Sequence, residues 1–324
     1  MDYTKIIKEI GRGKNHARDV DIDTARMLYQ QMLLGDVPDL ELGGILVALR
    51  IKGEGEAEML GFYQAMQQQM MRLTPPPSKL KPIVIPSYNG ARKQANLTPL
   101  LALLLSALGF PVVVHGVSDD PTRITSETVF AALGIMPAND AQQAQQHLNA
   151  GRPVFISIET LCPPLAKQLS LRWRMGVRNS AHTLAKLATP FEEAAALRLS
   201  SVSHPEYVAR VGAFFSAIGA PALLLNGTEG EVYANPQRCP AINLIPGNDV
   251  EPLVLLPRQE ENTIDDALPV SKDADVTATW IQRVINKDIA VPQSLRLQVA
   301  CCLVAAAEAA NIEAGLAIIE QAGF

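Results

Sequence analysis

Apolar residues recur at helical spacing along the first part of the chain, between positions 21 and 71. They lie three or four positions apart, as the buried face of a helix requires: Ala25, Leu28, Met32, Leu42, Ile45, Leu46, Leu49, Met59, Phe62 and Met66. Gly35 and Gly53 interrupt the pattern at points where helices would end. The first part of the chain is therefore predicted to be a small all-helical unit.

Consecutive prolines at positions 75–77 follow this helical pattern. Proline lacks the N–H group that a helix interior uses, so a run of prolines favours an extended connection. We therefore expect a helical domain over residues 1–74 and a second domain over residues 79–324. The helices predicted between about 163 and 188 are expected to pack on the helical domain.

Short apolar runs alternate with helical patterns beyond the prolines. Strands are predicted at 82–86, 111–116, 154–158, 222–225 and near 252–256. Helices are predicted at 95–108, 126–133, within 163–188, and at 205–218, 273–286 and 293–308. Strands that are apolar on both faces and alternate with helices are typical of a parallel sheet covered on both sides. The predicted fold class is α/β: a small all-helical N-terminal domain and a larger α/β domain with a mostly parallel central sheet.

Composition limits the class of protein and the cellular compartment that we expect for this fold. The chain has 324 residues, of which 48% are hydrophobic, so it can bury a large core. No run of eighteen apolar residues occurs, and the N-terminus lacks the charged and then apolar layout of a signal peptide. We expect a soluble, cytoplasmic protein without a membrane partner. Its four cysteines show no metal-binding spacing and are expected to be buried structural thiols.

Several segments resemble, in order and spacing, one family of enzymes. These are residues 35–37, 46–53, 96–98, 114–117, 125–126 and 133–135. The resemblance is to the family of anthranilate phosphoribosyltransferase and pyrimidine-nucleoside phosphorylase, and it runs over nearly the whole chain. It implies the class III phosphoribosyltransferase fold and a homodimer formed through the helical domain.

The phosphate-binding loop of that family is replaced here. The enzymes carry Gly-Thr-Gly-Gly-Asp after the first strand of the second domain, whereas this chain has Pro86-Ser87-Tyr88-Asn89-Gly90. Glycines let backbone N–H groups approach and surround a pyrophosphate. Proline removes one of these donors and tyrosine adds bulk, so phosphate binding is expected to be weakened.

Two further positions of the enzymes' site differ in this chain. Val114 stands where the enzymes have a lysine, while Val232 and Tyr233 stand where they have an Asp-Glu pair that helps to hold magnesium. The positions that the resemblance assigns to a degenerate phosphate site are Ser87, Asn89, Gly90, Asn96, Thr98 and His115. His115 is expected to satisfy a local hydrogen bond, and no residue is assigned a catalytic role.

Phosphoribosyl transfer is therefore expected to be weak or absent, and no cofactor is expected. This pattern resembles the divergent TrpD2 subgroup, which keeps the anthranilate phosphoribosyltransferase fold and is associated with nucleic-acid binding.

A basic segment supports that association. Residues 163–190 contain no Asp or Glu, although the net charge of the chain is −5. The cations of this basic segment are Lys167, Arg172, Arg174, Arg178 and Lys186. In a helix, Lys167 and Arg174 would share a face that Arg178 continues one turn later, and Trp173 could stack on a base. The plain alternative is a solvated helix face with Trp173 as a core residue under it. A smaller basic pair, Arg92-Lys93, lies at the start of a predicted helix, where anions are favoured.

Three functions follow from these patterns. The leading hypothesis is a non-catalytic homodimer that binds DNA or RNA with little sequence preference, through phosphate contacts of the basic segment. The first alternative is a phosphoribosyltransferase of altered specificity, with Glu229 or Glu231 holding magnesium and Asn96, Thr98 and Arg92 holding phosphate. The second alternative is a protein-interaction scaffold, in which the basic segment meets an acidic partner protein.

Overall fold

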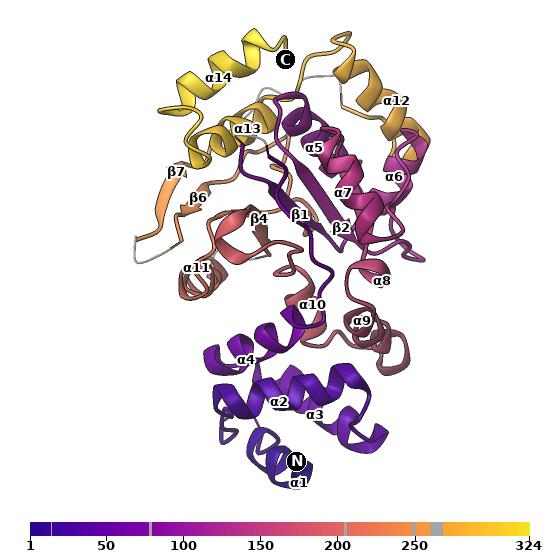
Figure 1. The fold of residues 1–324 in the computed structure, drawn as a ribbon, viewed down its shortest axis with the longest axis vertical. Helices are drawn as coiled ribbons and strands as arrows, with labels where there is room; N and C mark the ends of the chain where they lie inside the picture. Colours follow the sequence, from indigo (N-terminus) through magenta and orange to yellow (C-terminus); the bar gives the residue numbers. More distant parts are fainter. Residues whose placement is uncertain (14, 78–79, 204–205, 248–250, 260–267) are drawn as a thin grey trace. The chain divides into compact units, whose positions relative to one another are not determined.

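The computed structural model describes residues 1–13, 15–77, 80–203, 206–247, 251–259 and 268–324 (Figure 1). Its contacts divide the chain into two compact units. The helical unit comprises Met1–Met71 and Ile158–Pro190, and the α/β unit comprises Arg72–Ser157 and Phe191–Phe324. The chain thus passes from the helical unit to the α/β unit, returns to the helical unit for one segment, and ends in the α/β unit.

The helical unit contains short helices from both of its chain segments. They are α1 (Tyr3–Ile10), α2 (Ile22–Leu34), α3 (Asp39–Lys52), α4 (Glu56–Gln67), α8 (Ile158–Leu161), α9 (Pro163–Met175) and α10 (Ala181–Ala185). At the start of α2, the carboxylate of Asp21 accepts hydrogen bonds from the N–H and the hydroxyl of Thr24. Gly35, with φ +80°, ends the helix in the left-handed conformation.

Helices α2 and α4 cross closely in the core of this unit. The rings of Tyr29 and Phe62 stack with their centroids 4.9 Å apart. A Cβ at Gly61 would lie 2.5 Å from the carbonyl oxygen of Ile22, so the crossing requires glycine at this position. From α9, the side chain of Gln168 donates a 2.8 Å hydrogen bond to the carbonyl of Met32 in α2. The later segment is therefore joined to the N-terminal helices by a specific buried contact.

A buried ion pair holds the segment before α2 against the start of α4. Glu58 is fully buried and accepts hydrogen bonds from the ammonium of Lys52 (2.6 Å) and from the N–H groups of Val20 (3.1 Å) and Gly55 (2.7 Å). The ammonium of Lys52 also contacts Asp19. Burial alone would lower the pKa of Lys52, but the two carboxylates outweigh it and the pKa is raised.

The α/β unit is organised around one seven-stranded sheet with the order β3-β2-β1-β4-β5-β6-β7. The strands are β1 (Ile83–Ser87), β2 (Val112–Gly116), β3 (Val154–Ser157), β4 (Leu197–Val202), β5 (Ala222–Asn226), β6 (Ile242–Ile245) and β7 (Leu253–Leu256). The first five in this order are parallel, whereas β6 and β7 run antiparallel at one edge. The predicted mostly parallel sheet is therefore correct.

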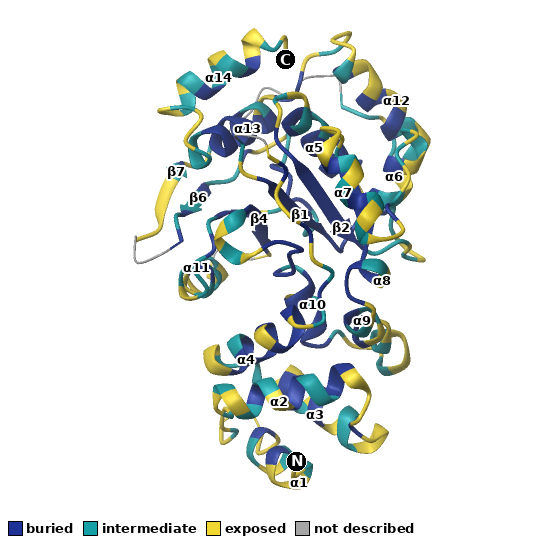
Figure 2. Cartoon of the chain, in the orientation of Figure 1, coloured by how far each residue is buried: buried dark blue, intermediate teal, exposed yellow. Residues whose placement is uncertain are grey.

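Helices cover this sheet and bury its apolar side chains. They are α5 (Thr98–Ala107), α6 (Ser126–Ala132), α7 (Ala141–Asn149), α11 (Tyr207–Ala217), α12 (Ala274–Ile285), α13 (Gln293–Ala305) and α14 (Ile312–Gln321), with a short 3-10 helix at Glu193–Ala195. Figure 2 shows β1 and β2 fully buried and α7 and α12 buried on one face only. This is the burial expected of a covered parallel sheet.

The pattern of apolar residues missed some elements and misplaced others. It did not predict β4, because Arg198, Ser200 and Ser201 interrupt the apolar run, although all three are buried. The helix predicted from residue 95 begins at Thr98, and the helix predicted from residue 205 begins at Tyr207, with residue 205 itself outside the described residues. Elements α7, β6 and α14 were not predicted either.

Membrane-spanning helices are not found in the described part of the chain, where no helix is long and apolar enough to cross a bilayer. The four cysteines are buried, and each has a free thiol. Burial raises the pKa of the thiols of Cys239 and Cys301 to about 12. They are inert structural thiols, as the sequence predicted.

Candidate functional site

The loop that follows β1 has a buried backbone. Ser87, Tyr88, Asn89 and Gly90 are all buried. Gly90 has φ +67°, and a Cβ at this position would lie 2.6 Å from the carbonyl oxygen of Ile124. Both the backbone conformation and the close approach therefore require glycine here.

A carboxylate of the chain itself fills this loop. The N–H groups of Asn89 and Gly90 donate to one oxygen of Glu231, at 2.8 and 2.7 Å. The hydroxyl of Thr98, at the start of α5, donates to the other oxygen at 3.0 Å. Glu231 is buried, so its charge is balanced by these donors rather than by water. Three of the predicted phosphate-site positions thus converge on an anion that belongs to the protein.

A chain of polar side chains continues from this carboxylate. Asn96 accepts a 3.1 Å hydrogen bond from the N–H of Thr98 and donates a 2.9 Å bond to the hydroxyl of Ser126. The hydroxyls of Ser126 and Ser87 lie 2.7 Å apart. Ser87, Asn96 and Thr98, which the resemblance grouped at one site, therefore belong to one buried hydrogen-bond network.

A second carboxylate binds the next turn of the same loop. Glu229 accepts hydrogen bonds from the N–H groups of Arg92 (2.7 Å) and Lys93 (3.0 Å). Partial burial would raise the pKa of Glu229, but these N–H groups, that of Gln94 and the charge of Arg123 lower it overall. The side chains of Arg92 and Lys93 are exposed. The expectation that this pair lies at the start of a helix is wrong, because α5 begins only at Thr98, and the anion that the two N–H groups bind is intramolecular.

His115 makes the local hydrogen bond predicted for it. It lies in β2, fully buried, with Nδ1 2.7 Å from the hydroxyl of Tyr88. The two rings also meet edge to face, with centroids 5.5 Å apart. The tyrosine that replaces a glycine of the enzymes' loop thus packs inward against β2.

The residues present do not fit a magnesium site at the expected position. Val232 and Tyr233 are buried, and the hydroxyl of Tyr233 donates to the carbonyl of Ala95 at 2.9 Å. Glu229 and Glu231, which could have substituted for the missing pair, are bound to N–H groups. Among the described residues, no group of three or more His, Cys, Asp or Glu side chains could hold a metal ion.

The basic segment presents its cations on α9 and on the turns that follow it. Lys167 and Arg174 are exposed on α9, and Arg174 lies 3.7 Å from Asp39. The expectation that Arg178 continues this helical face is wrong. Gly176, with φ +73°, ends α9 after Met175, so Arg178 lies in the turn before α10.

Trp173 is 57% exposed on the same helix, beside two cations. The guanidinium of Arg172 lies 4.1 Å from the centre of its ring. The alternative that Trp173 is a core residue is therefore wrong. Lys186, which directly follows α10, is half-buried.

The charges of three arginines act on His182 in the helical unit. Burial lowers the pKa of His182 to about 4, and the charges of Arg178, Arg172 and Arg50 lower it as well. Arg50 lies on α3, far from the basic segment in sequence, so the sequence patterns did not connect it with the other cations. The tertiary structure thus adds Arg50 to the cations of the basic segment. We term Arg50, Lys167, Arg172, Arg174 and Arg178 the cationic group.

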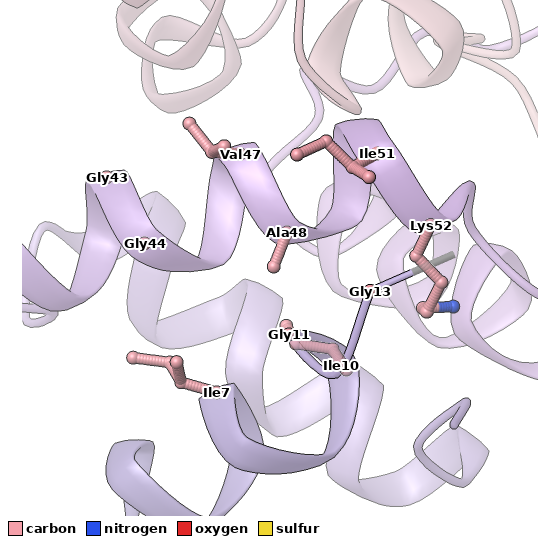
Figure 3. Close-up of a pocket in the computed structure, with 10 residues that line it drawn as sticks. All are labelled: Ile7, Ile10, Gly11, Gly13, Gly43, Gly44, Val47, Ala48, Ile51 and Lys52. Carbon is pink, nitrogen blue, oxygen red and sulfur yellow. The ribbon is translucent and has the colours of Figure 1, made fainter. Parts of the chain in front are cut away.

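The helical unit also carries an apolar hollow between α1 and α3. Its volume is about 470 Å³. Figure 3 shows residues that line it, among them Ile7 and Ile10 of α1 and Gly44, Val47 and Ile51 of α3. Ile51 is 60% exposed, which is unusual for an apolar side chain as large as isoleucine. Val47, one turn earlier on α3, is also exposed. Adjacent exposed apolar side chains are unusual for a surface that contacts only water.

Comparison with known proteins identifies the family. Residues 4–70 match the model of the glycosyl transferase family, helical bundle domain. The chain is 66% identical over 322 residues to the uncharacterized Escherichia coli (strain K12) protein YbiB, covering 99% of this chain and all of that one. The chain belongs to the TrpD2 (YbiB-like) family. It is 24% identical over 244 residues to anthranilate phosphoribosyltransferase of Desulfitobacterium hafniense, covering 75% of this chain and 71% of the enzyme.

Solved structures show the same fold for this TrpD2 protein. Anthranilate phosphoribosyltransferase from Thermus thermophilus superposes with a TM-score of 0.79 at 20% identity, covering 99% of this chain and 94% of that one. The Saccharomyces cerevisiae enzyme in complex with PRPP and Mg superposes with a TM-score of 0.76 at 12% identity, covering 99% and 92%. At these identities the likeness concerns the fold alone.

Proposed function

We propose that this TrpD2 protein binds nucleic acid, DNA or RNA, with little sequence preference. The observation that carries the proposal is the cationic group on the helical unit, where the charges of Arg50, Arg172 and Arg178 act on His182 and two exposed cations, Lys167 and Arg174, lie on α9. A group of cations attracts a polyanion, and a chain of phosphates supplies anions at regular spacing. Contacts to phosphate fix position without reading bases, so binding is not sequence-specific.

We also propose that the protein acts as a homodimer formed through the helical unit. The apolar hollow between α1 and α3, with exposed Val47 and Ile51, is suited to a second copy of the same face. Sedimentation should give a dimer for the parent and for Met136→Glu, which changes an exposed apolar side chain of the α/β unit. It should give a monomer for the pair Val47→Glu and Ile51→Glu. A folded double variant that remains dimeric would contradict this interface.

Fluorescence anisotropy of labelled oligonucleotides tests nucleic-acid binding. Single-stranded DNA, duplex DNA and RNA of equal length are titrated over a range of salt concentrations. If about five phosphates are neutralised, log affinity should fall with log salt with a slope of about −3.5 for single strands and about −4.5 for duplex DNA. Undetectable binding of all three at low salt would refute the proposal.

Two double charge-reversal variants, one in the basic segment and one in the α/β unit as its matched control, test where nucleic acid binds. Lys167→Glu with Arg174→Glu should weaken binding by two orders of magnitude or more at low salt, because it removes two cations and adds two anions. Arg258→Glu with Arg283→Glu changes the charge of the chain equally at two exposed sites of the α/β unit and should bind as the parent does. Equal affinity of both double variants would refute the role of the basic segment.

The alternative is a phosphoribosyltransferase of altered specificity. The fold and the buried network of Ser87, Asn96 and Ser126 support it. In this alternative Glu229 or Glu231 would have to leave its N–H donors to hold magnesium. Calorimetric titration with phosphoribosyl pyrophosphate and magnesium distinguishes the two functions, since micromolar binding would favour the enzyme and no heat would favour the non-catalytic protein.

A further inference from the structure

The loop after β1 and the start of α5 offer five hydrogen-bond donors to an anion. These donors form what we term the anion cradle: the N–H groups of residues 89, 90, 92 and 93 and the hydroxyl of Thr98. We infer that the anion cradle is an oxyanion site that the chain fills with its own carboxylates, Glu229 and Glu231, so that an external phosphate can enter only if these are removed.

The geometry of the anion cradle is that of a phosphate site. Its N–H groups act in neighbouring pairs, 89 and 90 on Glu231 and 92 and 93 on Glu229, and successive N–H groups of a turn are an arrangement that binds anions. The five donors meet carboxylate oxygens at 2.7 to 3.0 Å, within the range of protein hydrogen bonds. Each carboxylate takes a pair of neighbouring N–H groups, as the oxygens of a phosphate would. The donors are therefore shaped for an oxyanion, and the carboxylates are its substitute.

The backbone of the segment that carries Glu229 and Glu231 holds both carboxylates against the loop. Glu229 adopts φ +53°, a left-handed conformation that favours glycine, and its bonds to two N–H groups hold it there. Gly230, with φ +92°, approaches the loop so closely that a Cβ would lie 2.0 Å from Nδ2 of Asn89. The segment that carries Glu229 and Glu231 therefore lies directly against the loop after β1.

The negative charge of Glu229 also opposes the binding of phosphate at neutral pH. The N–H groups of the loop and Arg123 hold the pKa of Glu229 below its ordinary value, so the carboxylate is ionised. A phosphate would therefore meet a negative charge as well as occupied donors. This inference concerns the α/β unit alone and is independent of nucleic-acid binding by the helical unit.

The test removes the carboxylates and offers the simplest oxyanions. Glu229→Ala, Glu231→Ala and the double variant are titrated by calorimetry with inorganic phosphate and with pyrophosphate, without metal. The matched control is Glu308→Ala with Glu320→Ala, which removes two exposed carboxylates of the α/β unit. The double variant should bind saturably, about tenfold or more tighter than the parent and the control, and phosphate should raise its melting temperature.

Two results would overturn the inference. One is a double variant with the parent's circular dichroism spectrum that binds neither oxyanion more tightly than the control. The other covers the case in which the double variant does not fold: if it stays unfolded with either oxyanion present, and the folded Glu229→Ala variant binds neither, the anion cradle is not an oxyanion site. A double variant that folds only with phosphate or pyrophosphate would support the inference.

Discussion

Lowering the pH from 7 to 5 should destabilise the helical unit through one side chain, His182. Its burial and the charges of Arg178, Arg172 and Arg50 lower its pKa from 6.5 to about 4. In the folded protein the ring thus stays neutral down to about pH 4. In the unfolded chain it takes up a proton below about pH 6.5. The unfolded state binds more protons across this window, so the free energy of unfolding falls as the pH falls from about 6.5 to about 4.

The size of the expected loss of stability follows from the lowering of the pKa of His182. Each pKa unit corresponds to about 1.4 kcal/mol, so an unscreened shift of this size would remove about 2 kcal/mol between pH 7 and pH 5. His182 is partly exposed, and solvent screening reduces the expected loss to about 1 to 2 kcal/mol. His182→Gln cannot titrate, while glutamine can still accept the hydrogen bond that Asn179 N–H donates to Nδ1.

Urea unfolding of the parent and His182→Gln at both pH values measures the difference. The parent should lose about 1 to 2 kcal/mol more than the variant on going to pH 5. Nuclear magnetic resonance titration of the ring adds a second readout, because phosphates bound at Arg172 and Arg178 should raise the pKa of His182. Equal losses of stability in both proteins, together with a ring that titrates near pH 6.5, would refute this account of the cationic group.

Three further predictions concern single side chains. Glu58→Ala removes one carboxylate from a buried ammonium and the side-chain acceptor of two N–H groups, so urea unfolding should show a loss of about 3 kcal/mol or more, against about 1 to 2 for Glu58→Gln. Gly90→Ala places a Cβ against the carbonyl of Ile124 at positive φ and should cost about 2 kcal/mol or more, whereas Gly134→Ala, with positive φ but open space in the described structure, should cost about 1. Trp173→Ala should weaken binding of single-stranded DNA by about tenfold but bind duplex DNA as the parent does, because only unpaired bases can stack on the exposed ring; unchanged affinity for single strands would contradict this role.

The arrangement of helices and strands was largely readable from the chain because it depends on local spacing. Apolar runs such as 111–116 and 222–225 predict buried strands wherever they lie in the fold. The absence of acids from residues 163–190 likewise predicts a positive surface without knowledge of the fold. The replaced glycine loop could also be recognised directly, because it follows a predicted strand.

Strand β4 shows where local spacing fails. Its six residues are all buried, yet Arg198 and two serines give the segment a polar appearance. The guanidinium of Arg198 lies 3.9 Å from a carboxylate oxygen of Glu193 and 5.9 Å from the centre of the Phe215 ring. Tertiary contacts of this kind make burial of the charge acceptable, so the strand could not be inferred from hydrophobicity.

The sequence by itself determined the α/β class, the helical first domain, the loss of the glycine loop and the basic segment, because each is a property of neighbouring residues. The tertiary structure decided which side chains meet. It placed Glu231 on the N–H of Asn89 from 142 positions away, brought Arg50 near His182, and moved Arg178 off the helix. Contacts at such separations depend on where the sheet and the helix ends bring the chain back together, and no local pattern of residues records this.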